Sequence, residues 1–534
     1  MRRISVLLFV LAASCAWSAA GEVSTTEGRW SGIASPVDGA VTVYRGIPYA
    51  KPPLGALRWA APVRPGAWQG VRKADEFGQP CWQRLVPETS IYSRGSMQVS
   101  EDCLTLNLWT RPAAELRPVM VWFHGGANTS GHGNSLIFDG TRLAQKGVVV
   151  VNVNYRLGPM GFFAHPALTA ESQSASSGNY GLLDQTAALE WVQRNVAAFG
   201  GDPNRVTIFG QSAGAFDVCL LMASPLAKGL MHRVIAHSGT CLNVNTTLEV
   251  AEREGQSVAA HLATQTSAQV SPVPQRELEQ LRANTPEEIM AAVDAVGAAP
   301  GTPIVDGWVV PQAPVAAFGA GRYNRIPLIT GIVSDEFRGL GEAMSEMTRE
   351  QYEAEVRERF GERADDVLAT YESIADVSPR EALRKISTHS FFGAPTRLLA
   401  RLLTQGQTPA YVYHFSHPTA VFSLYIPERP EHEVPGGPRA LGAYHSGDLA
   451  YHFNNVGVVG LHWQPWDRRR ADMISGYWVN LARNRDPTGE GLPRWPRYTS
   501  KDLVQEFGAT VTPVLNPPHR EYDVFEAILA GEME

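Results

Sequence analysis

Apolar runs and alternating patterns along the chain predict a series of β-strands. Leu104–Trp109 alternates apolar and polar side chains with a period of two, which is typical of a half-buried strand. Pro118–Phe123 and Val148–Val153 are continuous apolar runs rich in β-branched residues, which favours strands buried on both faces. The same criteria predict further strands at Val41–Ala50, Val206–Phe209, Arg233–His237 and Ile326–Gly331.

Helical patterns separate these strands. Apolar residues recur at helical intervals from Leu182 to Phe199, and Gly200-Gly201 ends that helix, which we place at Asp184–Phe199. A second helix, Ala213–Met222, follows the strand Val206–Phe209 almost directly. Strands that alternate with helices predict an α/β fold with a large, mostly parallel central sheet and helices on both faces.

Two long stretches, Thr246–Ala299 and Met347–Leu403, depart from this alternation. The first is rich in Ala, Glu, Gln and Arg and is divided by prolines, so we expect helices joined by loops. The second is largely helical in pattern. We interpret both as helical insertions that lie over the sheet and form walls above an active site. The chain contains no linker and no internal repeat, so residues 21–534 are expected to form one domain.

Residues 1–20 carry the pattern of a secretory signal peptide. Two arginines precede the apolar stretch Ile4–Ala13, and Ser18-Ala19-Ala20 supplies small residues before a cleavage site at Gly21. The apolar stretch is too short to span a membrane, and no other segment is apolar over sufficient length. We therefore expect an exported protein, periplasmic or secreted. The alternative is a lipoprotein that is acylated on Cys15.

Charge and cysteine content indicate which partners, disulfides and metal sites to expect. Loss of the signal peptide leaves 44 basic and 53 acidic residues, a formal charge of −9, which argues against nucleic acid as a partner. Four cysteines remain, and an even number in an exported chain favours two disulfides. We prefer the sequential pairing, Cys81–Cys103 and Cys219–Cys241, with four free thiols as the alternative. No Cys-x-x-Cys motif or histidine cluster indicates a metal site, and no cofactor is expected.

The segment Gly210-Gln211-Ser212-Ala213-Gly214 joins a predicted strand to a predicted helix and has the G-x-S-x-G pattern. A nucleophilic serine on so tight a turn needs small residues two positions away on either side, because strand and helix pass close together there. The N-terminus of the helix then directs amide donors at an oxyanion formed beside the serine. The alternative is a glycine-rich turn with a solvent-facing serine, but the flanking strand and helix favour a nucleophile.

A hydrolase with this turn also needs an acid, a base and an oxyanion hole. After Ser212, Asp335 and Glu336 follow a predicted strand, at the sheet edge where ligands bind in α/β folds. His445 lies in a loop further on, which gives the chain order of serine, acid and histidine. Before Ser212, a predicted strand ends in His124-Gly125-Gly126-Ala127, a source of oxyanion amides.

These residues resemble those of the type-B carboxylesterases, the carboxylesterase/cholinesterase family of the α/β-hydrolase fold. Three further segments match family motifs in the same order: Arg45-Gly46-Ile47-Pro48-Tyr49-Ala50, Glu101-Asp102-Cys103-Leu104-Thr105-Leu106-Asn107 and Asn154-Tyr155-Arg156. The resemblance covers nearly all of the mature chain. It implies an enzyme that hydrolyses small-molecule carboxylic esters through an acyl-enzyme.

The resemblance also implies a role for each residue of the site. Ser212 would be the nucleophile, His445 the general base and Glu336 the acid that orients His445. Asp335 is the alternative acid, and His124 is a less favoured alternative base. The oxyanion amides would come from Gly126, Ala127 and Ala213. Three other histidines are expected to be packing or surface residues: His414, His452 and His462.

Outside the triad, the resemblance implies three further features. Ser238 and Asp448 match a pair that supports the catalytic histidine. Arg45 would form an ion pair with Glu101. The pairing of the first two cysteines, Cys81 and Cys103, matches the first disulfide of the family. The Cys219–Cys241 pairing does not match the pattern of most members.

Two rival functions are weighed against ester hydrolysis. A non-catalytic binding protein on the same fold would lack the serine, whereas here Ser212, Glu336 and His445 are all present. A lipase that acts on emulsified lipid esters would need a mobile apolar lid. Activity on a dissolved short-chain ester, compared with an emulsified triglyceride, distinguishes the lipase from the carboxylesterase.

The residue before the nucleophile bears on substrate charge. In cholinesterases this residue is a glutamate, and a tryptophan in the first disulfide loop holds the quaternary ammonium by cation–π contact. Here Gln211 precedes Ser212, and Glu88–Val99 contains Tyr92 but no tryptophan. Trp82 lies at the wrong end of the loop. We therefore expect neutral esters to be preferred over choline esters. Whether anionic esters are also substrates stays an open question.

Overall fold

The computed structural model describes residues 21–84, 98–265, 274–298, 301–338, 346–420, 437, 439–457, 462–518 and 520–531. The predicted signal peptide and lipoprotein cysteine lie outside the described residues, as does most of the loop between Cys81 and Cys103, including Tyr92. No helix within the described ranges is both long enough and apolar enough to cross a bilayer.

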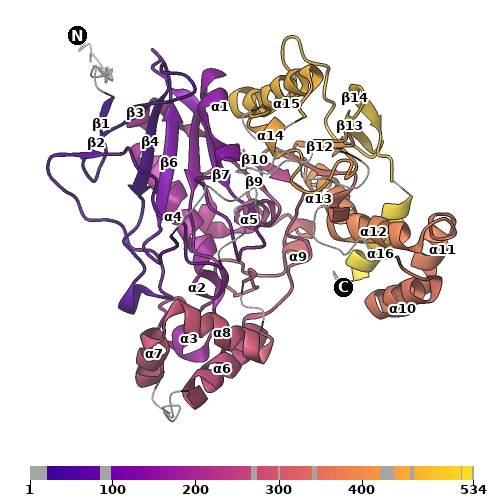
Figure 1. Cartoon of the computed structure of the whole chain (residues 1–534), viewed down its shortest axis with the longest axis horizontal. Coiled ribbons are helices and arrows are strands. Elements are labelled where there is room, and N and C mark those ends of the chain that lie inside the picture. The colour runs from indigo at the N-terminus through magenta and orange to yellow at the C-terminus, as the bar shows by residue number, and fades with distance from the viewer. Residues whose placement is uncertain are drawn as a thin grey trace, which may run out of the picture.

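An 11-stranded sheet runs through the molecule in the order β14-β13-β12-β11-β10-β9-β7-β8-β6-β4-β3 (Figure 1). Consecutive pairs from β13 to β8 are parallel, and the pairs at both ends of the sheet are antiparallel. The predicted large, mostly parallel sheet is confirmed. Its strands are β3 (Ile33–Ala34), β4 (Thr42–Pro48), β6 (Thr105–Thr110), β7 (Arg117–Phe123), β8 (Val149–Val153), β9 (Gly201–Gln211), β10 (Arg233–His237), β11 (Leu328–Val333), β12 (Ala410–Phe415), β13 (Leu503–Phe507) and β14 (Val511–Leu515). A separate small sheet contains β1 (Glu22–Ser24), β2 (Arg29–Ser31) and β5 (Val71–Lys73).

Strand β7 illustrates why apolar runs form the centre of this sheet. Val119, Val121 and Phe123 belong to one hydrophobic core, whereas Met120 and Trp122 belong to a second. Successive side chains of a strand point to opposite faces, so a continuous apolar run fills both cores. Each fully buried side chain of this size stabilises the fold by about 1.5–3 kcal/mol.

Helices cover both faces of the sheet, as predicted. The first core contains apolar side chains of α4, α5 and α13, and the second contains those of α1, α14 and α15. The predicted helix Asp184–Phe199 is split into α4 and a short 3-10 helix, η3. The bounds of these elements are α1 (Thr141–Gln145), α4 (Tyr180–Asn195), η3 (Val196–Phe199), α5 (Ala213–Ala223), α13 (Ala394–Gln405), α14 (Leu449–His452) and α15 (Pro465–Asn484).

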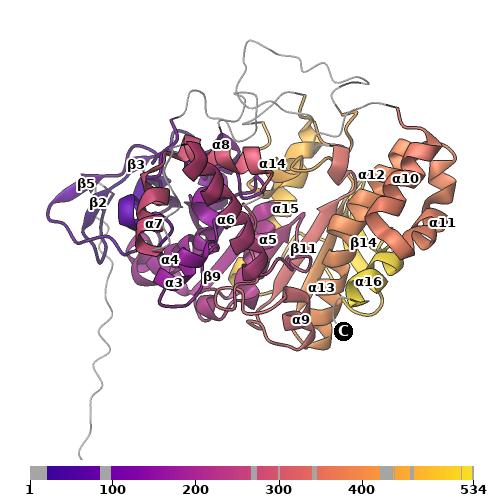
Figure 2. The same cartoon turned by 90° about the horizontal axis from the view of Figure 1, so that it is seen from below.

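The two long helical stretches form separate groups in both views (Figures 1 and 2). In the first, α7 packs against α3 and α8 packs against α2. In the second, α12 packs against η5 and η7, so this group borders the predicted acid Glu336. The first group contains α6 (Leu248–Gln265), α7 (Pro274–Ala283) and α8 (Pro286–Val296), and the second contains α10 (Arg349–Phe360), α11 (Ala364–Ala375) and α12 (Pro379–Thr388). The remaining elements are α2 (Gly158–Phe162), α3 (Pro166–Glu171), α9 (Pro314–Gly319), α16 (Glu521–Gly531), η1 (Gly55–Leu57), η2 (Leu136–Phe138), η4 (Pro225–Ala227), η5 (Glu336–Arg338), η6 (Gly361–Arg363) and the π-helix η7 (His389–Gly393).

Two disulfides are present, Cys81–Cys103 and Cys219–Cys241. The predicted ion pair between Arg45 and Glu101 is wrong. Glu101 instead accepts two hydrogen bonds of 2.6 Å from Arg58, and the Arg45 guanidinium lies over the ring of Phe77. The planar guanidinium of Arg58 matches both oxygens of one carboxylate, which makes this a strong pairing geometry.

Candidate active site

Ser212 lies at the turn between β9 and α5 and is half-buried. Its backbone has φ 55° and ψ −126°, a strained combination for a residue with a side chain. A Cβ on Gly210 would lie 2.3 Å from the Gly214 carbonyl oxygen, and one on Gly214 would lie 2.1 Å from the Phe123 oxygen. Only glycine therefore permits this close crossing of strand and helix, as the G-x-S-x-G motif predicts.

His445 and Glu336 form a buried hydrogen-bonded pair. Nδ1 of His445 lies 2.5 Å from Oε2 of Glu336. Glu336 is fully buried, and its Oε1 accepts a hydrogen bond of 3.1 Å from the Val333 amide. Because the carboxylate accepts from Nδ1–H, Nε2 of the neutral imidazole keeps its lone pair for an incoming proton.

A short β-bridge brings this pair together. Asp335 bridges to Tyr444 in parallel orientation, and the Asp335 amide donates to the Ala443 carbonyl at 3.0 Å. The bridge aligns the two segments, so the next residue on each, Glu336 and His445, lie side by side. Neither site residue belongs to a strand of the large sheet, yet the backbone still sets their spacing.

The alternative acid, Asp335, faces other partners. Its carboxylate accepts a 2.6 Å hydrogen bond from Ser334 Oγ and lies 3.6 Å from both Arg338 and Lys385. No hydrogen bond joins Asp335 to His445 within the described ranges. Asp335 therefore holds the backbone of the site, while Glu336 contacts the imidazole.

The alternative base, His124, is enclosed by the protein. Its side chain is almost fully buried, its ring stacks on Tyr155 at a centroid distance of 4.5 Å, and Nδ1 lies 2.8 Å from the Gly125 carbonyl oxygen. Burial lowers the pKa of His124 to about 3. A histidine so weakly basic is a poor proton acceptor near neutral pH, and its contacts indicate a structural role.

Gln211 contacts the His445 imidazole at Nε2, the ring nitrogen that Glu336 does not contact. Its Nε2 lies 3.0 Å from Nε2 of His445, and Ser212 Oγ makes no hydrogen bond in the part of the chain that the structure describes. No sequence pattern predicted this contact. Because Gln211 directly precedes Ser212, the contact brings His445 next to the nucleophile. In free enzymes the bond from nucleophile to base is often long and tightens when substrate binds.

The glycine-rich loop after β7 packs against Ser212. A Cβ on Gly125 would lie 3.0 Å from the Ser212 Cβ. The backbone amides of Gly126, Ala127 and Ala213 donate no hydrogen bond to any residue that the structure describes. Three amide donors without an internal acceptor, beside one serine, are the arrangement that an oxyanion hole requires.

The sequence and the fold of this chain both recur in known proteins. The sequence model of the carboxylesterase family matches residues 19–514. The chain belongs to the carboxylesterase family. Fumonisin B1 esterase of Sphingopyxis macrogoltabida is 34% identical over 494 residues, covering 90% of this chain and 86% of the relative. Liver carboxylesterase 1 of Oryctolagus cuniculus is 33% identical over 563 residues, covering 95% and 93%.

Solved structures of esterases are also similar to this carboxylesterase-family chain. A carboxylesterase of Geobacillus stearothermophilus superimposes with a TM-score of 0.80 at 31% identity, covering 95% of this chain and all of that one. A PNB esterase gives a TM-score of 0.80 at 28% identity. The fold is therefore the α/β-hydrolase fold, and the chain is an enzyme of the carboxylic ester hydrolase class.

The predicted supporting pair of this carboxylesterase, Ser238 and Asp448, makes no direct hydrogen bond to His445 within the described ranges. Asp448 Oδ2 lies 2.8 Å from Nε2 of His452, and that ring stacks on His237 at a centroid distance of 3.8 Å. Among the described residues, Asp448 Oδ1 and Ser238 Oγ are buried without a hydrogen-bond partner. The contacts that the structure gives to His445 come instead from Glu336, Gln211 and an aromatic ring.

Four phenylalanines form an aromatic wall beside His445. The Phe392 ring lies 5.3 Å from the imidazole and 4.8 Å from the ring of Phe391, which is 45% exposed. Phe216 lies 5.7 Å from Phe391, and Phe337 lies 5.9 Å from Phe392. Phe391 and Phe392 belong to the π-helix η7, a bulge that is frequent at functional sites. The sequence shows only two adjacent phenylalanines in a helical stretch, and nothing in that pattern marks a π-helix.

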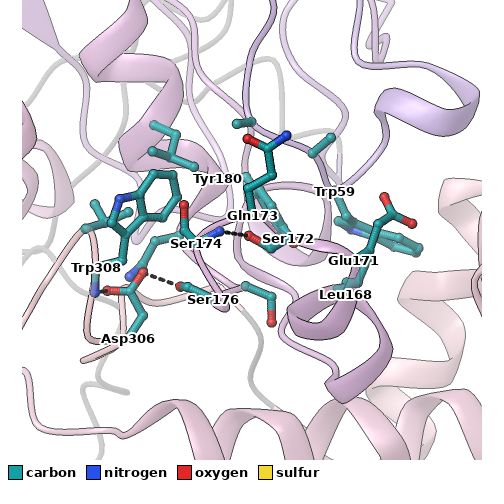
Figure 3. Close-up of a pocket in the computed structure, with 16 residues that line it drawn as sticks. Trp59, Leu168, Glu171, Ser172, Gln173, Ser174, Ser176, Tyr180, Asp306 and Trp308 are labelled. Atoms are coloured by element: carbon teal, nitrogen blue, oxygen red, sulfur yellow. Dashed lines mark hydrogen bonds between the residues drawn. The ribbon is translucent and has the colours of Figure 1, made fainter. Parts of the chain in front are cut away.

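A separate pocket of about 420 Å³ lies between α3, α4 and the segment around Trp308 (Figure 3). No triad or oxyanion residue lines it. Its carboxylates are already engaged: Asp306 accepts from Ser176 Oγ and from the Val310 amide, each at 2.8 Å, and Glu171 pairs with Arg282. We assign no chemistry to this pocket. Among the described residues, no group of three or more His, Cys, Asp or Glu side chains could hold a metal ion.

Proposed function

We propose that this enzyme hydrolyses esters by two-step acyl transfer, with Ser212 as nucleophile, His445 as general base and Glu336 as the orienting acid. The observation that supports this proposal most is the 2.5 Å hydrogen bond between His445 and Glu336, beside a strained serine at the start of α5. The three amides without an internal acceptor support the same assignment.

In the first step His445 Nε2 takes the Ser212 proton while Oγ attacks the ester carbonyl carbon. Gln211 releases Nε2 for this transfer. The oxyanion accepts hydrogen bonds from the Gly126, Ala127 and Ala213 amides, and each such donor lowers the barrier by about 2.7–4 kcal/mol. The imidazolium then protonates the leaving alcohol. Water repeats the sequence on the acyl-enzyme and releases the carboxylic acid.

The aromatic wall supports an apolar, uncharged substrate group beside the reacting carbonyl. Phe391 is partly exposed while Phe392 lies against the imidazole, so an acyl or alkyl chain placed there loses contact with water. Removing apolar surface from water stabilises a complex by about 25 cal/mol per Å². Gln211, which contacts Nε2 of His445, carries no charge.

The proposed function is tested with purified mature protein on a dissolved short-chain butyrate ester and on an emulsified triglyceride. A carboxylesterase hydrolyses the dissolved ester with saturable kinetics and shows no increase in rate as the ester passes its solubility limit. Activity only on the emulsion would make the enzyme a lipase. Hydrolysis of neither substrate would favour a binding protein.

Neutral esters are expected to exceed choline esters in kcat/KM by at least about tenfold, because desolvating the ammonium without a compensating anion is costly. The matched pair is butyrylcholine and 3,3-dimethylbutyl butyrate, which has carbon in place of the ammonium nitrogen. Gln211→Glu is expected to narrow the difference by roughly tenfold, because it adds a nearby negative charge. Equal or faster turnover of butyrylcholine by the wild-type enzyme would show that another group supplies a cation site.

We further propose that the protein is exported, and the two disulfides support this because such bonds persist in oxidising compartments. N-terminal sequencing of the mature protein is expected to begin near Gly21, and the denatured, unreduced protein is expected to contain no reactive thiol. A blocked N-terminus at Cys15 would instead identify a lipoprotein. Four reactive thiols would exclude both disulfides in solution.

A further inference from the structure

Asp217 is a buried carboxyl group that the proposed mechanism does not use. It lies on α5, five residues after Ser212, and is fully buried. Within the described ranges, no Lys, Arg or His forms an ion pair with it. Burial raises the pKa of Asp217 to about 7. An ionisable group kept in such a site without a counter-charge is costly, so its hydrogen bonds need an explanation.

Those hydrogen bonds connect the nucleophile helix to the oxyanion loop. Asn128 Nδ2 donates to Asp217 Oδ1 at 3.0 Å, and Gln185 Nε2 of α4 donates to Oδ2 at 2.6 Å. Asn128 directly follows Ala127 in the loop after β7 and is almost fully buried. A single carboxyl group on α5 thus holds the residue next to the proposed oxyanion donors.

The loop has a backbone that needs to be held. Gly126, Ala127 and Asn128 have φ values of 112°, 55° and 55°, three consecutive residues with positive φ. Residues with side chains adopt such angles only where their surroundings fix them. Besides Asp217, the contacts that fix Asn128 are Gly158, whose amide donates to the Asn128 carbonyl at 2.6 Å, and Tyr155, whose hydroxyl lies 3.1 Å from Oδ1.

We propose that Asp217 is a positioning residue for the oxyanion hole, which holds Asn128 so that the Gly126 and Ala127 amides stay directed at the substrate carbonyl oxygen. This inference rests on the proposed function. Asp217 touches neither substrate nor reacting atoms, and it acts through Asn128. Misplaced donors weaken binding of the transition state more than binding of the ester, so the effect falls on kcat.

The hydrogen bonds, and not the negative charge, carry this role. As a carboxylate, Asp217 accepts from both amides. As a neutral acid it needs an acceptor for its own proton, and Gln185 Oε1 is buried without a hydrogen-bond partner among the described residues, so a rotated Gln185 amide supplies one. Asn128 keeps its acceptor in both states. Asparagine at position 217 resembles the neutral acid and preserves the same contacts.

The test compares Asp217→Ala and Asp217→Asn on a soluble butyrate ester. Asp217→Ala is expected to lower kcat by about 10–100-fold, less than the full loss of an oxyanion donor, with KM changed less than about threefold. Its Ki for a trifluoromethyl ketone, whose hemiketal oxygen occupies the oxyanion hole, should rise by a similar factor. Asp217→Asn should retain kcat within about threefold of the wild-type value.

Asn128→Gly approaches the same bond from the other side and tolerates the positive φ. It should lower kcat to a similar extent, and the double variant should lose no more than the worse single variant, because both changes break one contact. The matched control is Asp306→Ala. This change also removes a buried carboxyl group, but one that accepts a hydrogen bond from a backbone amide and lies outside the proposed site. Its melting temperature should fall while kcat stays at the wild-type value.

A loss of stability in Asp217→Ala with an unchanged kcat and ketone Ki would overturn the inference. A kcat loss in Asp217→Asn equal to that in Asp217→Ala would also overturn it, since the charge would then carry the effect. If Asp217→Ala does not fold, Asn128→Gly decides the question by the same criteria. Failure of the proposed function is separate, since Ser212→Ala would then retain ester hydrolysis.

Discussion

Ser212→Ala is expected to lose at least about 10⁴-fold in kcat on a dissolved butyrate ester, because without Oγ no acyl-enzyme forms. The residual rate would reflect substrate binding and the oxyanion amides alone. The loss should be in kcat, with little change in KM, because Ser212 acts in the chemical step. Initial rates at saturating ester concentration, measured with active wild-type enzyme as reference, give this value.

The Ser212→Ala variant should remain folded. The side chain is half-buried and makes no hydrogen bond within the described ranges, and alanine takes the same strained backbone no worse than serine. Its melting temperature and circular dichroism spectrum should therefore match those of the wild-type protein. A folded variant that hydrolyses the ester at close to the wild-type rate would exclude Ser212 as the nucleophile.

Glu336→Gln is expected to lower kcat by roughly 10³–10⁴-fold, because a neutral amide neither fixes the imidazole tautomer nor stabilises the imidazolium. The comparison variant is Asp335→Asn, which leaves the Glu336–His445 hydrogen bond intact and keeps the bridge between Asp335 and Tyr444. We expect Asp335→Asn to lower kcat by less than about tenfold, since its carboxylate contacts no reacting group. The same ester assay at saturation measures both variants.

The order of the two effects decides between the neighbouring carboxylates. A larger loss in Asp335→Asn than in Glu336→Gln would mean that the two residues exchange roles in solution. Matched melting temperatures are needed as a control, because Glu336 is fully buried and also accepts the Val333 amide. An amide oxygen at position 336 still accepts that hydrogen bond, so the stability of Glu336→Gln is expected to fall only modestly.

The centre of the fold could be predicted because its strands are apolar on both faces. The predicted Arg233–His237 coincides with β10, and Val148–Val153 differs from β8 by one residue. The outer strands β13 and β14 carry no such signal, because short strands at a sheet edge mix polar and apolar residues. β13 forms against its parallel neighbour β12, and β14 forms against β13 in antiparallel orientation, so both depend on pairing across the sheet.

In the candidate site, too, some features are predictable from local sequence and others are not. Ser212, Glu336 and His445 stand in motifs that keep a fixed order along the chain, so the sequence alone predicts them as the candidate triad. The contact of Gln211 with His445 and that of Asp217 with Asn128 join segments far apart in the chain, and no local pattern encodes them. The ion pair of Glu101 forms with Arg58 rather than Arg45 for the same reason, since tertiary packing selects among several arginines.

Covalent labelling of the resting enzyme with an organophosphate, followed by mass spectrometry, tests the central claim most directly. The reagent phosphorylates an activated serine, so the wild-type protein should gain one adduct, and peptide mapping should locate it on Ser212. Ser212→Ala should gain none under the same conditions. An adduct on any other serine of the wild-type protein, or labelling of Ser212→Ala, would contradict the proposed catalytic triad.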